Sequence, residues 1–138
     1  MEGYYAYWDE LVRRHPALLI DSCASGGRRN DLETLWRAVP ILRSDFAGDP
    51  VTYPPHTQQN HIYGLSFWSP YHGAGFAAID PYVSRSLMGT IVGIGTDLRR
   101  TDLDLDLLRR LLREIREVGP CYLGDYWPLT PYRTGPDA

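Results

Sequence analysis

The sequence holds only two cysteines, Cys23 and Cys121, and they stand far apart in the chain. Two isolated cysteines exclude a disulfide framework, and their spacing fits no zinc-binding pattern. Because disulfide-stapled folds belong to oxidising compartments, the scarcity of cysteine favours the cytoplasm as the location of the protein.

The sequence also lacks an excess of positive charge, a long apolar run and a leader-like N-terminus. Lysine and arginine total 14 against 17 aspartates and glutamates, so the formal charge is −3, which argues against nucleic acid as a partner. No apolar run approaches the ~20 residues that cross a bilayer, so no membrane association is expected. No basic stretch followed by an apolar one opens the chain, so no signal peptide is expected.

The residues that are present form the composition of a folded globular protein. Of the 138 residues, 43% are apolar and 12% are aromatic. This balance excludes a disordered or fibrous chain, and the length suits one hydrophobic core. We therefore expect a single domain over residues 1–138.

Helix-like and strand-like segments alternate along the chain. Apolar residues at helical spacing predict helices, and short continuous apolar runs predict buried parallel strands. The second helix is expected to start at Asn30, with Glu33 as its capping partner. One helix followed by four βα units indicates an α/β fold with a parallel sheet. The other predicted helices cover residues 2–14, 81–89 and 102–118, and the predicted strands cover residues 17–20, 39–42, 61–68 and 91–94.

Reactive groups in a parallel α/β sheet gather just beyond the carboxyl ends of its strands. This rule selects residues 21–29, Asp45 and residues 68–75 as candidate sites. Because neighbouring parallel strands lie ~5 Å apart, Cys23 and Asp45 can face the same cleft.

Asp45 is the first candidate for catalysis. A carboxyl group at a strand end can be partly desolvated, which raises its pKa and lets it protonate a leaving-group oxygen. The alternative is an ordinary loop aspartate that caps the next helix.

The turn from Cys23 to Arg29 is the second candidate. Its glycines let backbone amides approach a ligand closely, and its arginines can hold an anion. A small-residue turn with surface arginines is the structural alternative. Nucleophilic catalysis by Cys23 or Ser25, with His61 or His72 as the base, is a further reading, although the Gly-x-Ser-x-Gly elbow is absent.

Aromatic and acidic residues supply two more features. Trp68, Tyr71 and His72 fall in an expected loop, where rings can stack on the apolar C–H face of a sugar; simple packing under the loop is the alternative. The series Asp97, Asp102, Asp104 and Asp106 looks like a metal site. It is better explained as an acidic helix N-terminus, which the helix dipole favours, so no metal is expected.

These stretches together resemble the retaining α-galactosidases of glycoside hydrolase family 36. The family's Cys-x-x-Gly-x-x-Arg motif falls on Cys23, Gly26 and Arg29, and its Ser-Asp pair falls on Ser44 and Asp45. The likeness covers residues 3 to about 133, and the order of the motifs makes it specific. Three further stretches share it: Tyr63-Gly64-Leu65-Ser66-Phe67-Trp68, Asp80-Pro81-Tyr82 and Gly124-Asp125-Tyr126.

The resemblance implies a site, a substrate and a fold. Asp45 is implied to be the general acid/base in the hydrolysis of terminal α-galactosyl residues of oligosaccharides. Cys23 and Gly26 are implied to line the galactose subsite, with Arg29 as electrostatic support and Trp68 as a wall residue. The implied fold is the second half of a (β/α)8 barrel, about four βα units preceded by one helix. No cofactor is implied.

The nucleophile of that family is an aspartate in a Lys-Trp-Asp type motif, and this sequence does not contain one. Trp8-Asp9 is no substitute, because it falls within the first predicted helix and follows no strand. We therefore expect a partial catalytic barrel that is inactive alone and forms homo-oligomers through its open edges. A non-catalytic galactose-binding remnant is the alternative function.

Overall fold

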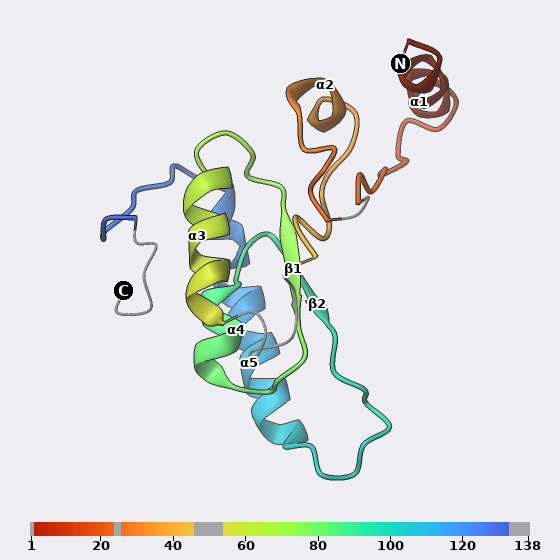
Figure 1. Ribbon diagram of the computed structural model, residues 1–138. Helices are drawn as coiled ribbons and strands as arrows, with labels where there is room; N and C mark the ends of the chain where they lie inside the picture. Colours follow the sequence, from red (N-terminus) through yellow and green to blue (C-terminus); the bar gives the residue numbers. More distant parts are fainter. Residues whose placement is uncertain (1, 24–25, 46–53, 133–138) are drawn as a thin grey trace.

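The computed structural model describes residues 2–23, 26–45 and 54–132 (Figure 1). Within them, five α-helices, two strands and one 3₁₀ helix follow in this order: α1 (Glu2–Arg14), α2 (Leu32–Leu35), α3 (Pro55–Leu65), β1 (Gly73–Phe76), α4 (Pro81–Ser86), β2 (Ile91–Ile94), α5 (Leu105–Val118) and η1 (Gly119–Leu123). β1 and β2 pair in parallel, with Gly73 opposite Ile91 and Phe76 opposite Ile94.

The expected fold class is wrong. The described residues contain two parallel strands and are otherwise mostly helical, so they do not show four βα units of a half barrel. Of the four predicted strands, only residues 91–94 form one, as β2. The predicted strand at 17–20 fails because its apolar run is not buried: Leu18 and Leu19 are exposed to solvent.

The predicted strand over residues 61–68 is instead the second half of α3 and the turn after it. Its aromatic and branched residues favour a strand locally, but the chain enters this region through Pro55, which suits the first turn of a helix. The real strand is β1, whose sequence Gly-Ala-Gly-Phe carries no strand signal. A Cβ at Gly73 would collide with the carbonyl oxygens of Ile41 and Ile91, so glycine is needed where three backbones meet.

The predicted strand over residues 39–42 is an extended segment with few ladder hydrogen bonds. One isolated parallel bridge joins Asp21 to Val39. On the other side, Gly73 donates to the Pro40 carbonyl at 3.0 Å and Arg43 donates to the Gly73 carbonyl at 2.9 Å. The segment therefore runs beside the first residue of β1, and Arg43 and Asp45 follow this contact.

The hydrophobic core joins β1 to α4 and α5. Ala74 and Phe76 of β1 pack with Leu87, just after α4, and with Leu108 of α5. The leucines of α5 repeat at helical spacing, and Asp104 caps the helix by accepting from the Leu107 amide at 2.8 Å. The predicted helix over 102–118 is thus confirmed, with a later start.

An ion pair joins α1 to the chain just after α2. The predicted helix over 2–14 is confirmed as α1, and Arg37 pairs with Asp9 of that helix at 2.5 Å. α1 and α2 lie together at one end of the molecule, away from α4 and α5 (Figure 1). The cap of α2 is Asp31, which accepts from the Thr34 amide, and not Asn30.

Candidate functional site

The turn that begins at Gly26 packs directly on Asp45. Gly26 has a φ of 64°, the left-handed region that glycine adopts without strain. A Cβ at Gly26 would lie closer than 3.0 Å to the Asp45 amide nitrogen and 3.0 Å from its Cγ. The structure therefore brings together two of the residues that the sequence selected for one site.

The neighbouring residues of the turn fasten it to the same segment. A Cβ at Gly27 would collide with the carbonyl oxygen of Arg43, and the Asn30 side chain donates to that carbonyl at 3.2 Å. Asp45 itself is exposed, so its carboxyl group is open to a ligand. The turn thus forms a close-packed backbone wall beside a solvent-accessible carboxyl.

Cys23 lies exposed at the start of this region. Its amide donates to Asp21 Oδ1 at 3.0 Å, and the Ile41 amide donates to the same oxygen at 3.2 Å. Through these two bonds, Asp21 links Cys23 to the segment that contains Ile41 and continues to Asp45. Ser25, the other candidate nucleophile, lies outside the described residues.

The side chains of Arg29 and Trp68 make their hydrogen bonds to other parts of the structure. Arg29 donates to the Tyr4 hydroxyl at 3.0 Å and sits over the Tyr4 ring, so it contacts α1. Trp68 precedes β1 and does not follow a strand. It lines a shallow depression with residues 30–33, and its indole donates to the Gly64 carbonyl at 3.1 Å. Among the contacts of the described residues, none joins Arg29 or Trp68 to Asp45.

A buried polar cluster lies behind the segment that carries Asp45. Arg43 and His72 are each only 2% exposed. Arg43 donates to His72 Nδ1 at 3.1 Å and to Gln58 Oε1 at 3.1 Å, and His72 Nε2 lies 3.1 Å from Ser66 Oγ. No carboxylate pairs with Arg43 within the part of the chain that the structure describes.

The guanidinium group fixes the protonation of this cluster. A guanidinium only donates, so His72 Nδ1 must accept and the proton of the neutral ring sits on Nε2, which donates to Ser66. Burial, the Arg43 charge and His61 lower the pKa of His72 to about 4, and burial lowers the pKa of Arg43 to about 10. His72 is therefore neutral, with its Nδ1 accepting from Arg43 and its Nε2 donating to Ser66.

The sequence reasoning missed the bonds of Arg43 to His72 and to Gln58. Arg43 stands directly before the Ser-Asp pair, which was the one available signal. Its neighbours in space come from positions 58, 66 and 72, and no local pattern links them. Only the placement of α3 beside the segments that carry Arg43 and His72 brings these side chains together.

The acidic residues near α5 serve as a helix cap and as partners of arginines. Asp104 caps the helix, and Asp97, Asp102 and Asp106 pair with Arg99, Arg100 and Arg109 respectively. In the described ranges, no group of three or more histidine, cysteine or acidic side chains is placed to hold a metal ion. None of the helices in these ranges combines the length and the apolar character that crossing a membrane requires.

Comparisons with protein-family models, with curated proteins and with solved structures found no match to this chain.

Proposed function

We propose that this chain carries the acid/base part of a retaining α-galactosidase site, which acts on terminal α-galactosyl residues of oligosaccharides. The contact between Gly26 and Asp45 supports the proposal most directly. The resemblance assigns Asp45 to acid/base catalysis and Gly26 to the galactose subsite, and the two residues come from segments that pack against each other.

Asp45 has the role of general acid/base in this proposal. Its exposed carboxyl protonates the glycosidic oxygen as the bond to the anomeric carbon breaks, and then takes a proton from the incoming water. The backbone of Gly26 and Gly27 forms the adjacent wall, where side chains would collide with the Asp45 segment. Cys23, exposed beside this wall, contributes to the galactose subsite.

Retaining hydrolysis needs a second carboxylate about 5–5.5 Å from the first. The only Trp-Asp pair in the sequence is Trp8-Asp9, within α1, where Asp9 pairs with Arg37. We therefore assign the acid/base to this chain and the nucleophile to a carboxylate that this chain does not supply. On this proposal the chain alone binds galactosides and turns them over negligibly.

Added azide can replace the missing nucleophile, so it allows the acid/base role of Asp45 to be tested in this chain. Azide attacks the anomeric carbon of an α-galactoside from the β face as the bond to the aglycone oxygen breaks. That oxygen takes the Asp45 proton, and solvent reprotonates the carboxylate. The expected product is β-galactosyl azide, formed at a rate that rises with azide concentration.

Comparing two leaving groups isolates the proton transfer. A p-nitrophenyl aglycone leaves without protonation, whereas a sugar aglycone needs it. Asp45→Asn should therefore lower azide-dependent release of the sugar at least tenfold and change p-nitrophenol release far less. Asp97→Asn, an exposed aspartate on a distant loop, is the matched control and should change neither rate.

The outcomes separate the two candidate functions. Equal loss on both substrates removes the acid/base assignment. Galactose binding without azide-dependent release overturns the hydrolase proposal and leaves galactose binding alone, the function that the absent Lys-Trp-Asp motif favours. Absence of both binding and release removes the galactoside as a ligand.

A further inference from the structure

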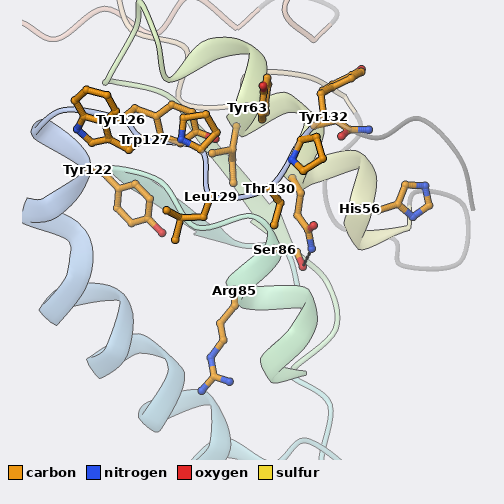
Figure 2. Close-up of a pocket in the computed structure, with 15 residues that line it drawn as sticks. His56, Tyr63, Arg85, Ser86, Tyr122, Tyr126, Trp127, Leu129, Thr130 and Tyr132 are labelled. Carbon is orange, nitrogen blue, oxygen red and sulfur yellow. Dashed lines mark hydrogen bonds between the residues drawn. The ribbon is translucent and has the colours of Figure 1, made fainter. Parts of the chain in front are cut away.

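A second concave site lies between α3 and the C-terminal segment that follows η1 (Figure 2). Its volume is about 500 Å³, within the range of small-molecule sites. Neither Asp45 nor any residue of the turn from Gly26 to Asn30 lines it. The cleft is therefore distinct from the site proposed above.

Side chains from α3, α4 and the C-terminal segment converge on this cleft. Tyr63 of α3 and Tyr126 of the C-terminal segment both line it, with ring centroids 6.4 Å apart. Gln59, also a lining residue, donates to the Tyr82 hydroxyl at 3.3 Å and to Ser86 Oγ at 2.8 Å. Segments distant in the sequence thus build one aromatic and hydrogen-bonded wall.

The aromatic rings of the cleft are only partly used by internal packing. Tyr63 contacts Tyr132 with centroids 5.4 Å apart, and burial raises the pKa of Tyr126. Trp127, in contrast, is 77% exposed at the edge of the cleft, as Figure 2 shows beside Tyr126. An indole face left in water at a concave site offers apolar area that a flat ligand can cover.

The charge of the cleft selects a neutral ligand. Among the described residues that line it, Arg85 is the only lysine, arginine, aspartate or glutamate, and it is paired with Glu114 at 2.7 and 3.0 Å. Asn60 adds an amide group that can donate to or accept from a hydroxyl, whereas Gln59, whose Nε2 already donates to Tyr82 and Ser86, offers its Oε1 as an acceptor. The combination of exposed ring faces, amides and balanced charge suits a polyhydroxylated ring.

We propose that this cleft is a second carbohydrate-binding site, which takes a neutral sugar ring or a short oligosaccharide. The C–H face of the sugar stacks on Trp127, and its hydroxyls bond to the amides of Gln59 and Asn60. The inference does not rest on catalysis at Asp45, because the two sites share no residue.

Trp127→Ala tests the stacking directly, and Trp36→Ala is its matched control. Both indoles are highly exposed, at 77% and 86%, so neither substitution empties the core. The probe is a neutral trisaccharide with a terminal α-galactosyl unit, titrated into the Asp45→Asn chain by calorimetry. Trp127→Ala should weaken binding at the cleft at least tenfold, and Trp36→Ala should leave it unchanged.

Indole NMR signals identify the site independently of affinity. The sequence has four tryptophans, and the signal absent from Trp127→Ala assigns that indole. The trisaccharide should shift the Trp127 signal and spare that of Trp36. The inference would be overturned if Trp127→Ala and Trp36→Ala bound the trisaccharide equally well, or if the Trp127 signal did not shift at saturation. It would also be overturned if the cleft bound a proline-rich peptide and no sugar. None of these results depends on the outcome at Asp45.

Discussion

Replacing Gly26 by alanine is the most informative perturbation of the candidate site. The left-handed φ of 64° disfavours any residue with a Cβ by about 1–2 kcal/mol. The added methyl group would also lie closer than 3.0 Å to the Asp45 amide nitrogen, so the two segments must separate. Overpacking of this kind typically destabilises by about 1–3 kcal/mol. We expect Gly26→Ala to lower the free energy of unfolding and to displace Asp45.

Gly64→Ala is the matched control, because it makes the same chemical change in open space. Gly64 lies in α3, and a Cβ there meets nothing within 4 Å. Alanine in a helix is favoured over glycine by about 0.5–1 kcal/mol, so this variant should be more stable than the parent.

Urea denaturation and galactoside titration of both variants give the answer. The two free energies of unfolding should move in opposite directions and differ by at least about 2 kcal/mol. Gly26→Ala should also weaken galactoside binding, whereas Gly64→Ala should not. A Gly26→Ala protein as stable as its parent, with unchanged binding, would refute the proposed contact and its role.

Three further predictions concern the cluster and helices that support the site. The pKa of His72 falls to about 4 in the folded chain, so the unfolded state binds more protons than the folded state between about pH 6.5 and pH 4. The free energy of unfolding should therefore decline by up to about 3 kcal/mol as the pH drops through that window. Urea melts at several pH values should show a flatter decline for His72→Gln, because glutamine does not titrate. Asp104→Ala removes the cap of α5 and should cost about 1 kcal/mol in thermal melts, with an unchanged melting temperature contradicting the cap. Leu111→Ala, at a buried position of α5, should cost about 2–5 kcal/mol in urea melts, whereas exposed Leu105→Ala should change little; equal losses would refute the assigned helix face.

Sequence patterns predicted the helices better than the strands. α1 and α5 follow from apolar residues at helical spacing, and both are confirmed. β1 could not be found in this way, because Gly-Ala-Gly-Phe is a strand only through its position between residue 41 and β2. Local propensity predicts a strand over residues 61–68, but the helix that begins at Pro55 continues to Leu65.

In the candidate site, too, the sequence predicts some features and the structure alone shows the others. The sequence predicts only that Cys23 and Asp45 can face the same cleft, and the contact between Gly26 and Asp45 comes from the structure. The bonds of Arg43 to His72 and Gln58 depend on the placement of α3 against the extended segment, which no spacing in the sequence encodes. These contacts depend on long-range packing, which sequence periodicity does not predict.

An amide NMR titration of the chain with methyl α-galactoside tests the central claim most directly. The account predicts saturable shifts centred on Gly26, Gly27 and Asp45, which Asp45→Asn reduces. Unperturbed signals at these three residues under saturating galactoside, or shifts confined to the cleft beside Trp127, would contradict a galactose subsite at Asp45.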